Sequence, residues 1–175
     1  MKKVLLTMVV AVMATVNVSA QLKSRYDTEN YKRGVELVEE GKLDEGVKLL
    51  EAELKEHPKN ALGQFYITTA YMELKQYEKA MSSIDKALKY MPKRCKEMRG
   101  IAHALKATIL SGFSEWEKAV EQLTICLSVL PKEKYKNRAV AHMQRAELYN
   151  KLGLYELAEQ DFKKAEELIT LVETE

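Results

Sequence analysis

The sequence is poor in the residues that mark turns, disulfides and sheets. It has three prolines, seven glycines, two cysteines and one tryptophan in 175 residues. Two cysteines cannot form the disulfide framework that holds many small secreted domains together. No segment alternates apolar and polar residues with the two-residue period of a strand. Phosphate-loop, dinucleotide-binding, nucleophile-elbow and metalloprotease motifs are also missing from the sequence. These absences exclude a disulfide scaffold and give no sign of a sheet or of a motif-based enzyme.

Only one long apolar run is present, and it lies at the start of the chain. It covers Val4–Val16, follows Lys2 and Lys3, and ends before the small residues of Val18-Ser19-Ala20. A membrane span needs about 20 apolar residues, so this run is too short for a permanent anchor. A basic start, an apolar stretch and a small-residue end are typical of a cleavable secretory signal. We therefore expect residues 1–20 to be removed, with no transmembrane segment left and the product exported to the periplasm, cell envelope or exterior.

The expected mature chain, residues 21–175, has the length of one domain and no net charge. Without Lys2 and Lys3, 26 basic residues balance 26 acidic ones. A balanced charge gives no general attraction to nucleic acid, so we expect no nucleic-acid partner. The balance is uneven along the chain, because residues 93–138 hold 10 basic and 5 acidic residues.

The prolines divide the chain into repeating segments. Pro58, Pro92 and Pro131 each follow an apolar run with helical spacing, and the interval between the last two is slightly longer than the first. Glycines between them are expected to end helices in the left-handed conformation: Gly41, Gly112 and Gly153. The pattern predicts an all-α chain of eight helices in four helix–turn–helix pairs. The predicted repeats cover about 27–60, 61–92, 93–131 and 132–172.

The positions of small and large residues in these repeats match a known family. The second repeat has the matching residues Tyr71, Tyr77, Ala80, Ile84, Ala87 and Pro92, and the fourth has Ala146, Tyr149, Gly153, Tyr155, Ala158, Phe162 and Ala165. In this respect the chain resembles the tetratricopeptide repeat family, whose unit is a helix pair of about 34 residues. The resemblance implies a right-handed superhelical stack of four helix–turn–helix repeats. Gly46 and Glu53 depart from the family's preference for alanine, and the last two repeats are longer than the family's unit, which is expected to lengthen their first helices.

Two histidines recur in the third and fourth repeats. The segment "IAHALKA" contains His103, and the segment "VAHMQRA" contains His142 at the matching place of the next repeat. They could bind a metal or act as an acid–base pair, or they could be packing residues copied by duplication. Duplication accounts for the recurrence without any chemistry, and no nearby residue is a clear third metal ligand. We favour packing, and we expect no metal, cofactor or catalytic residue.

The family resemblance also implies a binding surface. In such proteins the first helices line the concave side and hold a polypeptide. The residues expected there are Tyr31, Val35, Val38, Phe65, Thr69, Met72, Thr108, Met143, Glu147 and Asn150. Several of these side chains could instead pack between repeats. The partner would be another protein or a peptide.

Basic residues cluster where two of the longer helices are expected to begin. They are Lys93, Arg94, Lys96, Arg99, Lys132, Lys134, Lys136 and Arg138. Stacking should bring them to one side, which we call the basic edge. Cations at a helix start oppose the helix dipole, so their repetition suggests an acidic partner or anionic cell-surface material. We favour the other interpretation, which is a solvated edge without a partner.

Two further questions concern the cysteines and the end of the chain. An oxidising compartment would permit a disulfide between Cys95 and Cys126, but an expected axial offset of about 10 Å favours free thiols. The last helix has no later helix to cover Leu168, Ile169, Leu171 and Val172.

The family resemblance implies a non-catalytic protein–protein interaction scaffold. A self-associating structural protein of the envelope is the alternative, and a metal-binding or enzymatic role through His103 and His142 is the third.

Overall fold

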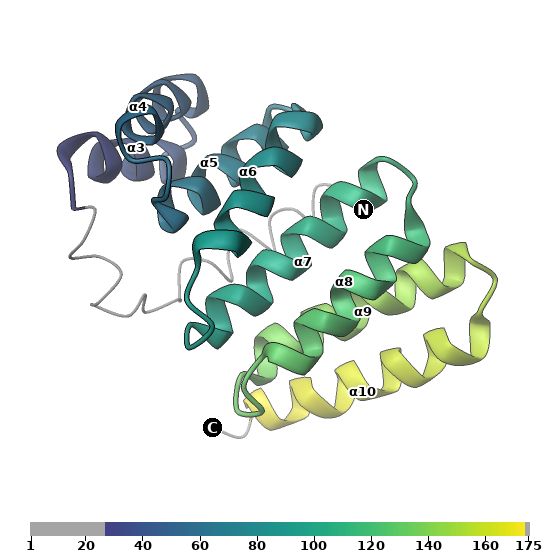
Figure 1. Ribbon diagram of the computed structural model, residues 1–175. Helices are drawn as coiled ribbons and strands as arrows, with labels where there is room; N and C mark the ends of the chain where they lie inside the picture. The colour runs from purple at the N-terminus through teal and green to yellow at the C-terminus, as the bar shows by residue number, and fades with distance from the viewer. Residues whose placement is uncertain (1–26, 174–175) are drawn as a thin grey trace. The chain divides into compact units, whose positions relative to one another are not determined.

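A computed structural model describes residues 27–173, and within this range the chain forms eight α-helices and no strands. The expected signal sequence, residues 1–20, lies outside the described residues. The helices belong to two compact units, which meet in sequence between Cys95 and Lys96. The N-terminal unit contains α3 (Glu29–Glu39), α4 (Leu43–Glu56), α5 (Ala61–Glu73) and α6 (Tyr77–Tyr90). The C-terminal unit contains α7 (Lys96–Gly112), α8 (Trp116–Val129), α9 (Tyr135–Lys151) and α10 (Tyr155–Glu173) (Figure 1). The prediction of four helix–turn–helix pairs is confirmed.

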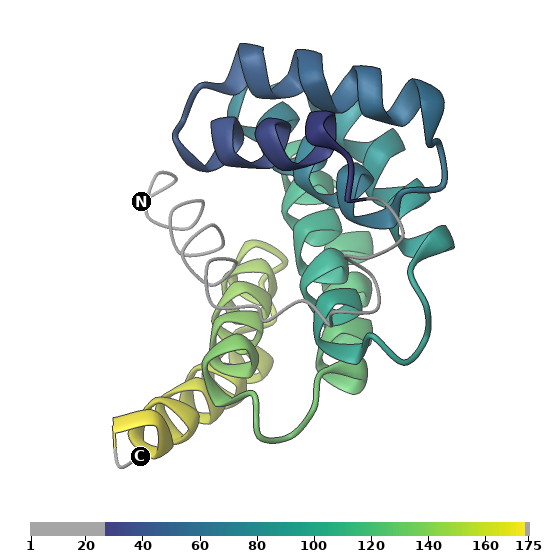
Figure 2. The ribbon, with the colours of Figure 1, turned by 90° about the vertical axis from the view of Figure 1, so that its left-hand side faces the viewer.

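In the N-terminal unit, α5 is the central helix. It packs against α3, α4 and α6, and 11 of its 13 residues are buried. The hairpin of α3 and α4 lies beside it, with the two helices running in opposite directions (Figure 2). A helix enclosed by three others buries nearly its whole circumference, which explains why buried residues lie on every side of α5.

Gly46 stands where the family prefers alanine because α3 and α4 approach very closely there. A Cβ atom at Gly46 would lie 2.7 Å from Cγ2 of Val38 and 3.0 Å from the backbone oxygen of Gly34. Both distances are shorter than carbon contacts in a packed interior. The departure from the family pattern is therefore a requirement of this helix pair.

Glu53, the second departure, joins two helix starts. It is 1% exposed and lies on α4. One of its carboxylate oxygens accepts a hydrogen bond from the hydroxyl of Thr28, and the other accepts one from Nδ2 of Asn60 at 2.9 Å. Thr28 is the N-cap of α3 and Asn60 is the N-cap of α5. A buried carboxylate is stabilised there by hydrogen bonds and by the positive ends of two helix dipoles.

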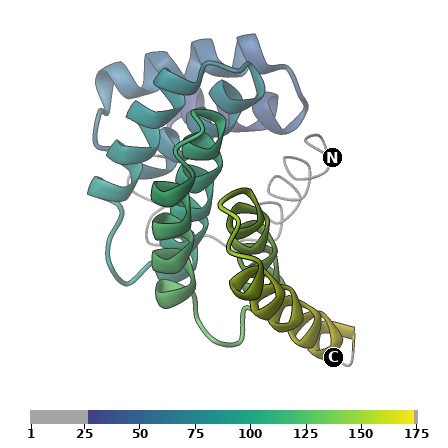
Figure 3. The same ribbon diagram turned by 90° about the vertical axis from the view of Figure 1, so that its right-hand side faces the viewer.

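In the C-terminal unit, the two hairpins have longer first helices. Helices α7 and α9 have 17 residues each, compared with 13 in α5. This confirms the expected lengthening. The prolines also act as predicted, because α4, α6 and α8 each end two residues before Pro58, Pro92 and Pro131. Figure 3 shows α9 and α10 side by side as an antiparallel pair.

The turn inside each hairpin has the same geometry. A backbone N–H bonds to the carbonyl five residues earlier, from Lys42 to Leu37, Gln76 to Tyr71, Glu115 to Leu110 and Leu154 to Tyr149. The residue before each donor has positive φ: Gly41, Lys75, Ser114 and Gly153. These are Schellman C-caps. The prediction is confirmed at Gly41 and Gly153 and wrong at Gly112, which is still helical, because the chain turns two residues later at Ser114.

Both cysteines are free thiols in the structure. Cys126 is buried on α8, and burial raises the pKa of its thiol to about 12, although Arg138 and Arg145 act in the opposite direction. A thiol with so high a pKa is almost entirely protonated and a poor nucleophile. Among residues 27–173, no helix has the length and apolar character needed to cross a membrane.

Candidate functional site

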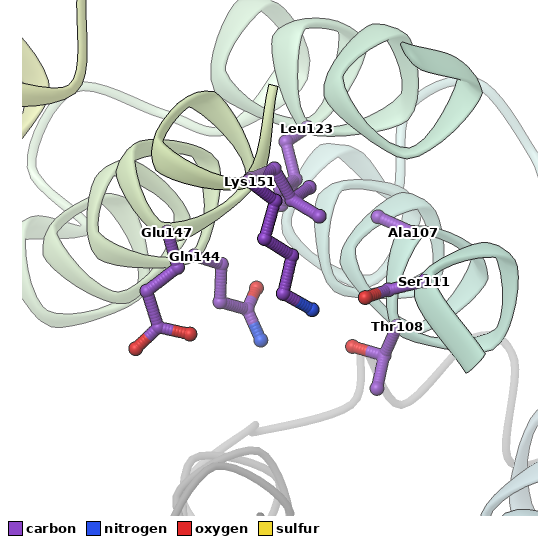
Figure 4. Close-up of a pocket in the computed structure, with 8 residues that line it drawn as sticks. Ala107, Thr108, Ser111, Leu123, Gln144, Glu147 and Lys151 are labelled. Carbon is purple, nitrogen blue, oxygen red and sulfur yellow. The ribbon is translucent and has the colours of Figure 1, made fainter. Parts of the chain in front are cut away.

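The C-terminal unit has a small pocket between the first helices of its two hairpins. It has a volume of about 50 Å³. Its walls come from three helices: Ala107, Thr108 and Ser111 on α7, Leu123 on α8, and Gln144, Glu147, Leu148 and Lys151 on α9. Figure 4 shows the polar side chains of α7 and α9 facing one another across the opening. The space is large enough for a water molecule or one small polar group.

Gln144 is the unusual residue of this pocket. The residue is 6% exposed, and neither Oε1 nor Nε2 of its side chain has a hydrogen-bond partner among the described residues. A buried polar group without a partner costs about 1–3 kcal/mol, and such groups are rare in folded proteins. The carboxamide extends from α9 toward the space in front of α7 (Figure 4). Within the described residues the fold pairs neither atom, so a small polar group that enters the pocket would meet an unbonded donor and an unbonded acceptor.

Glu147 and Lys151 add two opposite charges to the rim. Burial raises the pKa of the Glu147 carboxyl, and nearby Lys151 offsets part of this rise. The Lys151 ammonium lies 5.7 Å from the centre of the Trp116 ring, a cation–π distance. No ion pair to Glu147 occurs within the described part of the chain. Glu147 is thus a partly desolvated carboxylate that no cation of residues 27–173 pairs with directly.

The α7 side of the pocket supplies hydroxyl groups. Thr108 donates its hydroxyl hydrogen to the backbone oxygen of Ala104 at 3.1 Å, which leaves the oxygen able to accept a hydrogen bond. Ser111 lies one turn further along α7. Together the walls present a carboxamide, hydroxyls, a carboxylate and an ammonium group. This set recognises polar ligands by hydrogen bonds and charge, and it contains no nucleophile next to a base.

The residues expected to line a binding groove in the N-terminal unit lie mainly inside it. Tyr31, Phe65, Thr69 and Met72 are buried, with Phe65 only 2% exposed. Tyr31 packs edge-on to Tyr66, whose ring centre is 6.3 Å away. Val35 and Val38 are half-buried. These four side chains therefore pack between helices, which was the alternative to lining a groove, and three of them lie on α5, which is covered by helices on three sides.

The four residues expected in the C-terminal unit have different surroundings. Thr108 and Glu147 line the pocket, and Asn150 is exposed one turn beyond it. Met143 instead packs against a core cluster of Ala139, Ala165 and Leu168. The expectation did not include Gln144. Its signal in the sequence is a polar residue at helical spacing between Ala141 and Leu148, both of which are buried.

The two histidines make equivalent hydrogen bonds in their repeats. His103 Nδ1 is 2.9 Å from Oε1 of Gln122, and His142 Nδ1 is 2.8 Å from Oδ1 of Asp161. Each pair joins the two helices of one hairpin. In residues 27–173 no group of three or more His, Cys, Asp or Glu side chains is placed to hold a metal ion. The structure thus assigns each histidine a partner within its own hairpin.

The pair of the fourth hairpin is extended by Arg145. Its guanidinium donates to both carboxylate oxygens of Asp161, at 2.7 and 2.9 Å, and to the hydroxyl of Thr124 at 2.9 Å. Burial would raise the pKa of Asp161, but the hydrogen bonds from Arg145 and His142 outweigh it and lower the pKa. Burial lowers the pKa of His142 despite the nearby carboxylate. This cluster joins α8, α9 and α10 and has a structural role.

Two residues of the basic edge, Lys134 and Arg138, bind other groups of the same unit. In the C-terminal unit, Glu97 at the start of α7 forms an ion pair with Lys134 at 2.8 Å. Arg138 donates to the backbone oxygens of Leu127 and Leu130, at 2.8 and 3.2 Å, and so caps the end of α8. The other expected residues are Lys93, Arg94, Lys96, Lys132 and Lys136, which are all exposed, and Arg99, which is half-buried. Arg138 thus stabilises α8, because its positive charge lies at the negative C-terminal end of that helix.

The last helix exposes separate apolar residues. Tyr155, Leu157, Ile169 and Leu171 are exposed on α10, with Tyr155 at 71%, and Leu154 is exposed in the turn before it. The expectation that Leu168 is uncovered is wrong, because it packs on Ala139 and Ala165. Charged residues lie between the two ends of the helix. Two of them, Lys164 and Glu167, form an ion pair at 2.7 Å.

Comparisons with known proteins agree with this architecture. Two models described as tetratricopeptide repeat match residues 37–109 and 139–169. The structure of MamA AMB-1 is similar with a TM-score of 0.66 and 24% identity, over 85% of this chain and 79% of that one. A putative kinesin light chain from Podospora anserina, with nearly identical TPR-like repeats, has a TM-score of 0.64 and 18% identity, over 97% and 86%.

A third similar structure contains a bound partner. The TPR2B domain of yeast Sti1, solved as a complex with pHsp70, has a TM-score of 0.50 and 22% identity, over 79% of this chain and 94% of that one. No curated protein matches the sequence. At these identities the solved structures establish the fold alone. Since the two family matches together span more than half of the sequence, the chain belongs to the tetratricopeptide repeat family.

Proposed function

We propose that this protein is a non-catalytic interaction scaffold of the periplasm or cell envelope, and that it binds a polypeptide on the α7–α9 face of its C-terminal unit. Membership of the tetratricopeptide repeat family supports an interaction role. The Sti1 domain, which has the same fold, was solved as a complex with pHsp70. A binding role also agrees with the chemistry of the pocket, which offers hydrogen-bonding groups and charges but no activated nucleophile.

The observation that carries this proposal is that two polar side chains of α9, beside the hydroxyl groups of α7, have no hydrogen bond or ion pair to the described residues. Gln144 is buried and has no hydrogen-bond partner among the described residues, and Glu147 lacks a direct ion pair there. Thr108 and Ser111 line the same pocket from α7, and Figure 4 shows the Lys151 side chain reaching toward them from α9. Such groups reduce stability, so their presence side by side is better explained by binding than by folding.

Site-specific photo-cross-linking in the native cells tests the location of the binding face. A photoreactive phenylalanine analogue replaces Asn150 in one variant and Lys163, an exposed residue of α10, in the control. We expect a discrete cross-linked polypeptide from position 150 and none from position 163. Equal products from both positions, or none from either, would contradict the proposal.

Export is tested separately, because it depends on the first twenty residues. The expected mature protein starts at Gln21, after the apolar run of Val4–Val16 and the small residues ending at Ala20. N-terminal sequencing of the protein from an envelope or periplasmic fraction should read from Gln21. A protein that keeps Met1 and is found only in the cytoplasmic fraction would rule out export.

Self-association remains the second candidate, and the exposed apolar residues of α10 favour it. Tyr155 and Leu157 lie near the start of this helix, and Ile169 and Leu171 lie near its end. Exposed apolar surface at the end of a repeat array promotes association. Sedimentation velocity over a wide concentration range distinguishes the candidates. A monomer at every concentration would eliminate self-association, and an oligomer that Tyr155→Ser dissociates would support it.

A further inference from the structure

We infer that the α7–α9 pocket recognises a basic polypeptide segment, with one backbone amide paired to Gln144 and a lysine or arginine side chain paired to Glu147. This inference rests on the proposed function and adds the chemical class of the ligand. Both residues lie on α9, three positions apart, so their side chains leave the same face of the helix.

The carboxamide of Gln144 determines the first part of the ligand. It presents one acceptor, Oε1, and one donor, Nε2, and neither is used within the described residues. A peptide group has the complementary pair, an N–H donor and a C=O acceptor, so it can form two hydrogen bonds with one carboxamide. The pocket volume of about 50 Å³ admits a group of this size but not a folded domain. An extended segment laid across α7 and α9 meets both requirements.

The carboxylate of Glu147 determines the second part of the ligand, which is its charged side chain. It is half-buried, and burial already disfavours its charged form, so an added cation would stabilise it. Lys151 cannot fill this role fully, because its ammonium lies over the Trp116 ring. An acidic side chain at the same place would meet Glu147 and be repelled. A lysine or arginine of the ligand is therefore favoured over neutral or acidic residues.

The hydroxyl groups of α7 fix the direction from which the ligand approaches. Thr108 has used its hydrogen on the oxygen of Ala104, so its oxygen faces the pocket as an acceptor. The Ser111 hydroxyl can donate or accept. Further backbone N–H groups of the ligand can thus bond to the α7 wall, while Gln144 and Glu147 contact it from α9.

The test is a selection from a phage-displayed library of random peptides against the purified mature protein. Wild-type protein should enrich peptides that share a lysine or arginine at one fixed position. Gln144→Leu and Glu147→Gln should each weaken binding of the best synthetic peptide by about tenfold to a hundredfold, since each removes hydrogen bonds or charge from the contact. Gln160→Leu and Glu159→Gln, which make the same changes at exposed sites of α10, should leave binding unchanged.

Circular dichroism melting of each variant shows that lost binding does not come from unfolding. Glu147→Lys gives a sharper result, because it should shift the enriched position from basic to acidic residues. Enriched peptides without a basic residue, or peptides bound equally by wild type, Gln144→Leu and Glu147→Gln, would overturn the inference. Cross-linking at position 150 in that case would leave the proposed function intact. If neither peptides nor a cross-linked polypeptide are obtained, both fall.

Discussion

His142 and Asp161 lie 2.8 Å apart, Nδ1 to Oδ1, at the same place in the fourth hairpin that His103 and Gln122 occupy in the third. Both pairs have the same separation in sequence and join the first helix of a hairpin to its second. The same interhelical hydrogen bond therefore recurs in both hairpins, with a neutral amide beside the histidine in the third and a carboxylate in the fourth. Only the charged version attracts a further partner, Arg145.

Replacing Asp161 by asparagine is expected to lower the free energy of unfolding by about 3 kcal/mol. The amide keeps the shape of the carboxylate, but it leaves the half-buried Arg145 guanidinium without its counter-charge. The matched control is Glu167→Gln, which removes an exposed carboxylate from its pair with Lys164 and should leave the unfolding transition almost unchanged, because solvent screens an exposed pair. Urea denaturation measures both. If both variants changed the free energy of unfolding equally, the cluster of His142, Arg145 and Asp161 would not behave as a buried ion pair.

Stability should fall as the pH drops from neutral through the ordinary pKa of histidine. Burial lowers the pKa of both His103 and His142 in the folded state. The unfolded chain therefore binds these protons first, at about pH 6.5, and the folded state is penalised from there down to its own lower pKa values. Denaturation of the wild type across the range of about pH 5 to 7.5 measures this slope. The free energy of unfolding of the double variant His103→Gln/His142→Gln should depend less on pH in this window. An unchanged slope would refute the assignment of the pH dependence to these two histidines.

Replacing Glu53 by alanine should destabilise the protein by about 2–3 kcal/mol, although alanine is the residue that the family prefers at this position. The change removes the shared acceptor of Thr28 and Asn60, the N-caps of α3 and α5. Thermal or urea unfolding provides the measurement, with Glu56→Ala on the exposed side of α4 as control. If alanine is tolerated at position 53 as well as at 56, the buried carboxylate is not what ties the two helix starts together.

Ser114→Gly and Lys75→Gly should each stabilise the protein by about 0.5–1 kcal/mol. Both residues have positive φ, 61° and 59°, in turns where the other two hairpins have glycine. Glycine adopts this conformation without the steric cost that a Cβ atom imposes, and this gain exceeds its added freedom in the unfolded chain. The reverse change, Gly153→Ser, should destabilise by a similar amount. A loss of stability in Ser114→Gly, measured by the urea midpoint, would contradict this account.

The turn at Ser114 shows where sequence reasoning went wrong and how it could have succeeded. We expected glycine to mark the turn and chose Gly112, because glycine is the residue that most easily takes positive φ. The repeat register gives the better answer, since Ser114 occupies in the third repeat the place that Gly153 occupies in the fourth. Lys75 corresponds to Gly41 in the same way. The position of a turn within the repeat was more informative than the residue type.

The candidate site was only partly predictable. Thr108 and Glu147 were expected on the binding face and do line the pocket, whereas Gln144 was not expected. In the N-terminal unit, Tyr31 and Phe65 were expected to face a partner and are buried instead. The spacing of a helix predicts which residues share a face, but it does not tell how many neighbouring helices cover that face.

The sequence by itself determined the number of helices, their pairing and the ends that precede the prolines, since apolar spacing and proline act within one helix or one turn. The tertiary structure alone decided which side chains are enclosed and which partners they find. It buried Glu53 between two helix caps and gave Asp161 to both His142 and Arg145. It also left Gln144 without a partner among the described residues. The reason is physical: burial and hydrogen bonding depend on atoms brought together from distant positions in the chain, and no local pattern contains them.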